Sequence, residues 1–231
     1  MADQDKRLVS NVAGNFFVDA TCINCDACRQ LAPNSFEEIG GYSAVVRQPI
    51  DVQSVHQAYQ ALLACPVGSI GTEHTDKVRM SAARSSFPLL IEEDVYYCGF
   101  NSEKSFGANS FFVQHADGNW LIDSPRYVND LIAAFEQRGG IRYIFLTHED
   151  DVADAGKYAE HFGAKGLSMR LMPMPLPMRN GLSRGWSADK LPTGFRPFRS
   201  LGIPPAAWRC FIMRSFFLRA IIYGGIRSHG R

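Results

Sequence analysis

The sequence contains no long uninterrupted apolar run and no leader in which positive charge precedes an apolar segment. Its most apolar late stretch, residues 211–226, is interrupted by Arg214 and Arg219 and is too polar to cross a membrane. Cysteine is scarce, with 6 residues, and three of these fall within seven positions, unlike the cysteines of a disulfide framework. We therefore expect a protein of the reducing cytoplasm that does not bind membranes.

Net charge is also nearly absent, at +1, but the charged residues are unevenly distributed. Residues 1–75 carry eight acidic and four basic side chains, whereas residues 166–231 carry ten arginines, Lys190 and a single acid, Asp189. Such an abrupt change marks a boundary between segments of different character. With 231 residues, 46% of them hydrophobic, the chain is long enough to bury the cores of one or two domains.

Four of the cysteines form one pattern, a C-x-x-C-x-x-C run followed by a distant Cys-Pro: Cys22, Cys25, Cys28 and Cys65. Three thiolates on one loop and a fourth at the end of the apolar helical stretch 55–64 can each ligate one iron of a compact cluster. Four cysteines would also satisfy zinc, although zinc sites commonly use two separated C-x-x-C pairs. The pattern favours a single 4Fe-4S cluster.

The pattern resembles the single-cluster ferredoxins of bacterial type, over residues 15–72. Elements predicted around the cysteines agree with that resemblance: strands over 16–19, 42–46 and 67–70, a helix over 28–31 and a turn over 32–36. The resemblance implies an α+β ferredoxin-like domain over residues 1–75 that carries one electron to a redox partner protein. A cluster with a purely structural role is the alternative.

A second domain is expected after an interdomain linker at residues 76–88, which lack apolar periodicity. Two apolar runs, 111–113 and 120–123, flank Asp117-Gly118-Asn119 and predict a hairpin. A helix over 128–138 and a buried strand over 141–146 follow. Beyond that strand, the candidate metal ligands are His148, Asp150, Asp151 and Asp154. The alternative for these acids is a solvated helix start.

Residues 89–165 resemble the first half of the metallo-β-lactamase fold, an αβ/βα sandwich whose first metal motif is Thr-His-x-His-x-Asp-His. Residues 105–111 resemble the opening strand of that fold. His148 matches the first ligand and Asp154 the aspartate, but Asp150 or Asp151 stands where a histidine belongs, and Ala155 replaces the last one. The resemblance implies zinc or iron in the second domain, if it were complete, and a small ester or thioester substrate.

The tail, residues 166–231, is irregular and basic and does not complete such a domain. A single-base deletion would shift the reading frame, so the original frame joins the third base of each codon to the first two bases of the next. Read in that frame, the possible codons of residues 200–207 are compatible with the sequence Pro-Gly-His-Thr-Pro-Gly-Ser. Residues 211–222 likewise permit a string containing Tyr-His and Gly-Asp-His. These strings resemble the later metal motifs of the metallo-β-lactamase fold. We therefore hypothesise that the tail is translated from a shifted frame and expect no nucleic-acid partner.

Three functions are consistent with these patterns. The first is a ferredoxin domain fused to an incomplete metal-dependent hydrolase, and the second is an electron-transfer or interaction protein without hydrolase activity. The third, binding of nucleic acid by the basic tail, would be strongly salt-dependent and ranks last. The remaining cysteines add no ligands, because Cys98 is expected to be a small buried apolar residue and Cys210 lies in the tail.

Overall fold

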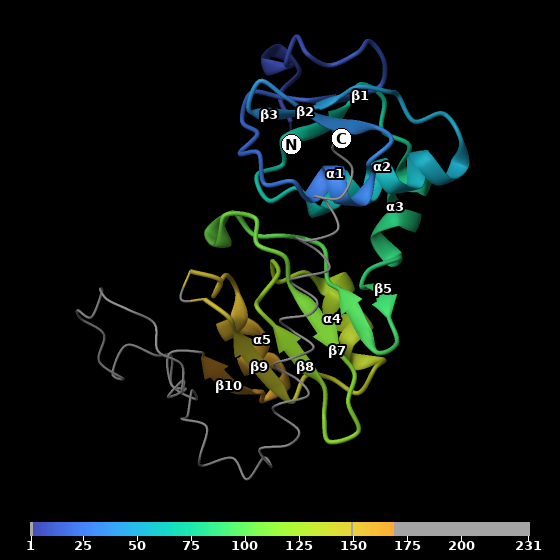
Figure 1. The fold of residues 1–231 in the computed structure, drawn as a ribbon. Helices are drawn as coiled ribbons and strands as arrows, with labels where there is room; N and C mark the ends of the chain where they lie inside the picture. Colours follow the sequence, from blue (N-terminus) through green and yellow to red (C-terminus); the bar gives the residue numbers. More distant parts are fainter. Residues whose placement is uncertain (1, 149, 169–231) are drawn as a thin grey trace, which may run out of the picture. The chain divides into compact units, whose positions relative to one another are not determined.

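The computed structural model describes residues 2–148 and 150–168 (Figure 1). We call residues 2–75 the first module and residues 89–168 the second module. The shifted frame, Cys210 and the basic tail beyond residue 168 lie outside the described residues. None of the helices within the described residues is long and apolar enough to span a membrane.

Two short antiparallel sheets and two helices make up most of the first module. A single 3-10 turn, η1 (Gln4–Lys6), precedes them. Strand β1 pairs with β4 and β2 with β3, and α1 and α2 pack together beneath them (Figure 1). The bounds are β1 Phe16–Val18, α1 Ala27–Leu31, β2 Phe36–Ile39, β3 Tyr42–Val45, α2 Val52–Ala64 and β4 Ile70–Thr72. Phe16 packs edge-on against Tyr59 at 5.0 Å between ring centroids and joins β1 to α2.

Helix α2 begins three residues before the predicted stretch 55–64 because Asp51 caps it. The Asp51 carboxylate accepts a hydrogen bond of 2.9 Å from the Ser54 N–H, which satisfies a donor that the first helical turn leaves free. The helix ends at Ala64, immediately before Cys65 and Pro66, since proline cannot continue a helix. The fourth cysteine of the motif therefore stands at a defined helix end.

Residues 76–88, predicted as the interdomain linker, contain helix α3 (Lys77–Ser85), which packs against α2. The Asp76 carboxylate caps this helix by accepting hydrogen bonds of 3.0 Å from the N–H groups of Val78 and Arg79. Ala83 is its only buried residue. The helix shows no apolar periodicity because so little of its surface is buried.

One mixed sheet of six strands, in the order β10-β9-β8-β7-β6-β5, forms the second module. Strands β5 to β8 are antiparallel, and β8, β9 and β10 are parallel. Their bounds are β5 Leu89–Glu92, β6 Val95–Tyr97, β7 Phe111–Val113, β8 Trp120–Ile122, β9 Tyr143–Leu146 and β10 Lys165–Ser168. The predicted hairpin is therefore the β7–β8 pair, and β10 continues three residues beyond the predicted end of the domain at residue 165.

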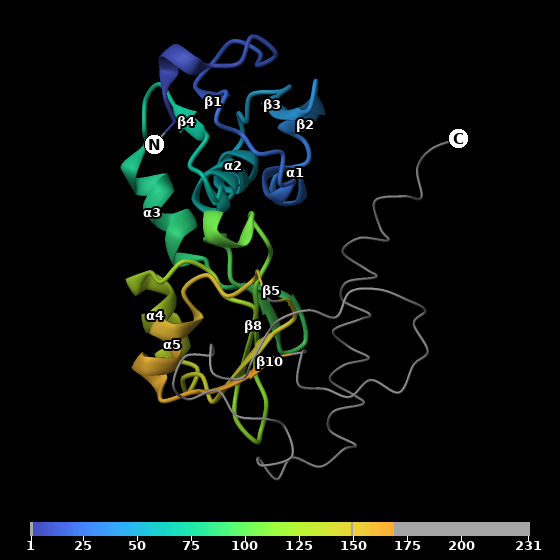
Figure 2. The ribbon, with the colours of Figure 1, turned by 90° about the vertical axis from the view of Figure 1, so that its left-hand side faces the viewer.

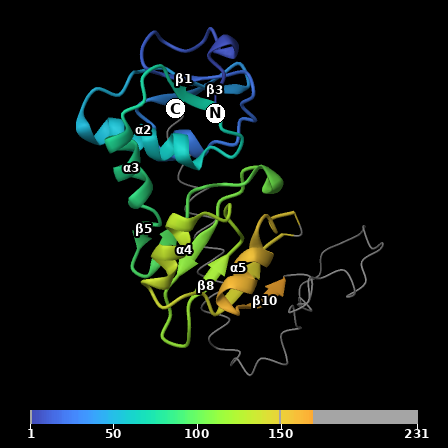
Figure 3. The same cartoon turned by 180° about the vertical axis from the view of Figure 1, so that it is seen from behind.

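Helices α4 (Asn129–Glu136) and α5 (Ala155–Phe162) lie on the same face of this sheet (Figures 2 and 3). The ring of Phe135 on α4 stacks on Phe112 of β7 at 4.7 Å and meets Tyr158 of α5 edge-on at 5.9 Å. Phe112, Phe135 and Tyr158 are fully buried. This aromatic contact holds both helices on the sheet.

Residues 105–111 do not form the opening strand that the resemblance implied. Glu103–Ser105 form a 3-10 turn, η2, and Phe106 and Gly107 follow with φ of +49° and +81°. A left-handed backbone cannot lie in an extended strand, so regular pairing begins only at Phe111. The strand that pairs with β7 on this side is β6, which the sequence did not predict.

We expect Phe135→Ala to lower the free energy of unfolding by about 3–5 kcal/mol, because the truncation leaves a cavity between α4, α5 and the sheet. Urea unfolding followed by circular dichroism measures this change. Val78→Ala is the matched control, since Val78 is 79% exposed on α3 and its truncation should change stability by less than about 0.5 kcal/mol. Equal effects of the two substitutions would contradict the assigned core.

Candidate metal centre

The four cysteines of the motif line one pocket. Cys22, Cys25 and Cys28 reach it from the loop before α1 and from α1 itself, and Cys65 reaches it from the end of α2. The other lining residues are mainly apolar: Val18, Ile23, Ala27, Ser43, Val67, Ser69 and Ile70. Two segments far apart in the sequence thus bring four sulfur ligands to one space.

The cysteine loop turns sharply because two of its residues have a left-handed backbone. Asn24 and Asp26 have φ of +56° and +71°, a region that Asn and Asp tolerate better than most residues. Arg29 fixes both, since its guanidinium donates hydrogen bonds to the Asp26 carboxylate, to Asn24 Oδ1 at 2.6 Å and to Ser43 Oγ at 2.6 Å. Sequence reasoning missed Arg29, although Asn and Asp immediately around Cys25 were a signal of tight turns.

A buried carboxylate anchors the chain on the other side of the pocket. Asp19 is 1% exposed and accepts hydrogen bonds from the N–H and the hydroxyl of Thr21. The Thr21 hydroxyl also lies 2.7 Å from the Ser69 hydroxyl, which joins the segment before Cys22 to the segment after Cys65. Burial alone would raise the pKa of Asp19, but the hydrogen bonds from Thr21 and from the Asp3 N–H outweigh it and lower that pKa.

Burial disfavours the thiolate form of three of the four cysteines. It raises the pKa of Cys28 to about 12 and also raises the pKa values of Cys25 and Cys65. Backbone N–H groups of Asn24 and Ser69 approach the sulfurs of Cys22 and Cys65 at 3.4 and 3.3 Å. At neutral pH the thiols with raised pKa therefore stay protonated unless a bound cation stabilises their thiolates, so loading with iron releases protons.

The arrangement of these cysteines bears on the choice between zinc and iron–sulfur. A tetrahedral zinc ion draws its sulfurs to about 2.3 Å from one point. Four cysteine thiolates that line one space are also the ligand set of a 4Fe-4S cluster, one on each iron. The C-x-x-C-x-x-C run with a distant Cys-Pro, more than the space itself, favours the cluster.

A glycine of the second module lies against this pocket. A Cβ added to Gly107 would lie 2.8 Å from Cys25 Cβ, 3.2 Å from Cys25 Sγ and 3.0 Å from Pro66 Cγ. Gly107 also has a φ of +81°, which a side chain would strain. The turn after η2 therefore closes on two residues of the cysteine motif and leaves no room for a side chain.

The residues predicted to bind metal in the second module are only partly brought together. His148 Nδ1 lies 3.3 Å from an Asp150 carboxylate oxygen, and the Asp151 N–H donates to the His148 carbonyl at 3.2 Å. Both His148 and Asp150 are exposed, with 59% of each side chain accessible. These residues lie in the turns before α5. This is also the position expected if the acids only form the solvated start of a helix. The metal site stays a prediction.

Asp154 is engaged by other groups. Its carboxylate accepts hydrogen bonds from Lys104 Nζ at 3.0 Å and from the Tyr127 N–H at 3.0 Å, and it pairs with Lys157 Nζ at 3.2 Å. Burial would raise the pKa of Asp154, but the Tyr127 N–H and the two lysines outweigh burial and lower that pKa. Asp154 therefore joins α5 to the segment after β8.

Residues 18–72 match the family model of the 4Fe-4S single cluster domain of Ferredoxin I. The matched segment runs from the end of β1 to the end of β4 and contains all four cysteines. This segment is therefore similar to a single-cluster iron–sulfur domain of ferredoxin type. The match does not extend to the second module, so it lends no support to the metallo-β-lactamase resemblance, to a second metal or to a hydrolase.

We expect Gly107→Ala to weaken retention of the iron–sulfur group, because the new methyl would press on Cys25 and Pro66. Gly139→Ala is the matched control. It imposes a similar backbone strain at φ +91°, but the nearest atom to its Cβ is 3.6 Å away. The measurement is the rate of loss of visible absorbance under air, which should rise several-fold for the first variant above the control. Equal rates would show that the close approach does not matter.

We expect Asp154→Asn to lower the free energy of unfolding at pH 7 by about 1–3 kcal/mol, because two lysines lose a carboxylate whose side chain is only 11% exposed. The pKa of Asp154 is lower in the folded protein than its ordinary 3.8, so its contribution is present above that value and is lost as the pH falls below it. Urea unfolding at pH 7 and pH 3 should therefore show a difference that shrinks in acid. Asp117→Asn is the control and should change the free energy of unfolding little, because the Asp117 side chain is 90% exposed. A loss of stability in Asp154→Asn that is the same at pH 7 and pH 3 would contradict this role of Asp154.

Proposed function

We propose that this protein is a one-electron carrier that holds a single 4Fe-4S cluster on Cys22, Cys25, Cys28 and Cys65. The observation that carries the proposal is that these four cysteines, from two distant segments, line one pocket of the segment that matches a single-cluster ferredoxin domain. When bound, the cluster supplies low-potential one-electron transfer.

The residues of the first module provide what such a carrier needs. The four thiols supply one ligand for each iron, and the loop conformation set by Arg29 holds three of them in place. Val18 and Ile70 are buried beside the sulfurs and keep water away from that side of the pocket. Low exposure and the backbone N–H groups near sulfur are two of the factors that set a cluster's potential.

Electron exchange, and not a purely structural cluster, is favoured by the position of Ile23. This side chain lines the pocket and is nevertheless 44% exposed, and Cys22 and Cys25 on either side of it are only partly buried. The exposed acids Glu37 and Glu38 on β2 suit a redox partner with a basic surface. Cytoplasmic location is part of the proposal and rests on the sequence alone.

Residues 89–165 are proposed to form a second module attached to this carrier through residues 76–88. No contact among the described residues favours hydrolysis of an ester or thioester over electron transfer. Hydrolysis, with zinc or iron at His148 and the neighbouring acids, therefore stays a prediction from the sequence.

The deciding experiment compares Cys65→Ala with Cys98→Ala in the full chain reconstituted with iron and sulfide without oxygen. The unsubstituted protein and Cys98→Ala should each bind about four irons and show an electron paramagnetic resonance signal after one-electron reduction. Cys98 is a matched control because it is fully buried but does not line the pocket. Cys65→Ala should lose the signal and most of the iron.

Two results would overturn the proposal. One is full iron content in Cys65→Ala, and the other is stoichiometric zinc without iron in the unsubstituted protein. Salt-dependent binding of nucleic acid without any iron would favour the third function considered from the sequence.

A further inference from the structure

An arginine of the second module reaches the helix end that carries the fourth cysteine. Arg126 follows β8, and its Nη2 donates a hydrogen bond of 2.7 Å to the carbonyl of Leu63. The same nitrogen lies 3.4 Å from the carbonyl of Cys65 itself. The guanidinium is therefore hydrogen-bonded to the carbonyls of Leu63 and Cys65, at the helix end and at the Cys-Pro peptide.

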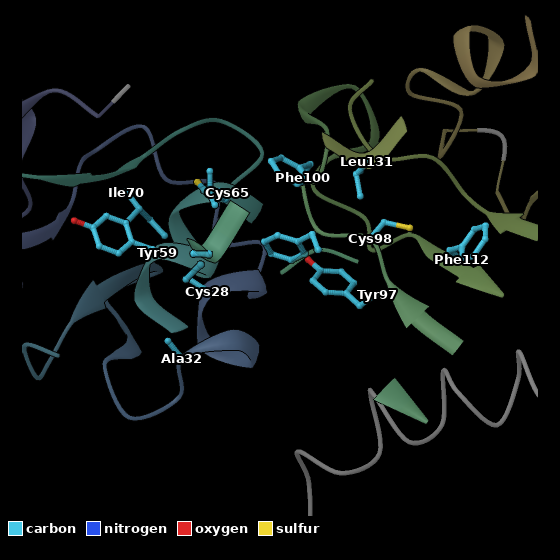
Figure 4. Close-up of a cluster of buried hydrophobic side chains, with 14 of the residues drawn as sticks. Cys28, Ala32, Tyr59, Cys65, Ile70, Tyr97, Cys98, Phe100, Phe112 and Leu131 are labelled. Atoms are coloured by element: carbon cyan, nitrogen blue, oxygen red, sulfur yellow. The ribbon is translucent and has the colours of Figure 1, made fainter. Parts of the chain in front are cut away.

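The backbone around Arg126 is held on several sides. Its N–H donates to the Phe100 carbonyl at 2.8 Å, and its carbonyl accepts from the Tyr158 hydroxyl at 2.8 Å. The N–H of the next residue, Tyr127, donates to Asp154. Phe100 and Cys65 belong to the same buried cluster (Figure 4). The second module thus fixes where the guanidinium lies.

The charge of Arg126 has no carboxylate to balance it among the described residues. Its hydrogen-bond acceptors there are carbonyl oxygens, and the titratable groups near enough to act on its charge are Cys65, when it is a thiolate, and Arg84. Burial lowers the pKa of Arg126, yet a guanidinium keeps its proton in proteins at neutral pH. A half-buried positive charge beside Cys65 is complementary to an anionic group held by that thiolate.

We propose that Arg126 is a positioning residue that raises the reduction potential of the group bound to Cys65, so that the second module tunes the first. This inference rests on the proposed function. A reduced one-electron carrier protein gives up one electron and is oxidised, while the iron–sulfur group is reduced and becomes more negative by one charge. No bond forms or breaks and no proton moves. A fixed positive charge nearby stabilises the more negative state.

The test is a potentiometric titration of the full chain, reconstituted with its cluster and followed by electron paramagnetic resonance. Arg126→Gln should lower the equilibrium constant for one-electron reduction about tenfold, which is a fall of about 59 mV. Arg126→Lys keeps the charge and should retain most of the potential. Arg142→Gln is the control, because it removes the same charge from an exposed residue immediately before β9 that donates to the Asp117 carbonyl. This variant should leave the potential unchanged.

An unchanged potential in Arg126→Gln with full iron content would overturn the inference, as would an equal fall in the lysine variant. If the glutamine variant does not fold, Arg126→Met keeps an apolar stem without the charge and takes its place under the same criteria. Thermal unfolding of each variant shows which of them fold. Failure of the unsubstituted protein to bind iron would instead refute the proposed function, so the two failures are distinguishable.

Discussion

The rest of the first module depends on one constraint, the meeting of the end of α2 with the loop that contains Cys22, Cys25 and Cys28. That meeting requires a helix with a sharp end, which Asp51 at one terminus and Pro66 at the other provide. It also requires the flanking segments to be joined, which the β1–β4 pairing and the Thr21–Ser69 hydroxyl contact achieve. Burial disfavours the thiolates of Cys28 and Cys65, and a bound cation would offset that cost.

Features that depend on near neighbours in the sequence could be predicted, and features that depend on distant ones could not. The cysteine spacing, the α2 helix and the β7–β8 hairpin are local patterns, and the structure contains them all. Helix α3 shows no apolar periodicity in the sequence because it buries a single residue. Strand β5 shows no strand pattern because its side chains are largely exposed. Arg126 was out of reach, since its partner Leu63 lies 63 positions away in the sequence.

The stretch from His148 to Asp154 shows why residue types alone do not define a site. Histidine and aspartate suit a metal, but the same aspartate also suits lysines and backbone N–H groups. In the structure the Asp154 carboxylate contacts two lysines and accepts from the Tyr127 N–H, and the metal site stays a prediction. The sequence could not distinguish these outcomes, because Lys104 comes from a turn 50 positions away.

These contacts connect the two modules in a physically continuous way. Asp154 holds the N–H of Tyr127, the neighbouring Arg126 is held by Phe100 and Tyr158, and its guanidinium ends on the carbonyls around Cys65. Gly107 of the same module also lies close to the Cys25 side chain. A module that touches two of four ligands, and brings a charge to one of them, forms part of the environment on which a cluster's potential depends. The second module therefore contributes to the surroundings of the proposed cluster site through Arg126 and Gly107.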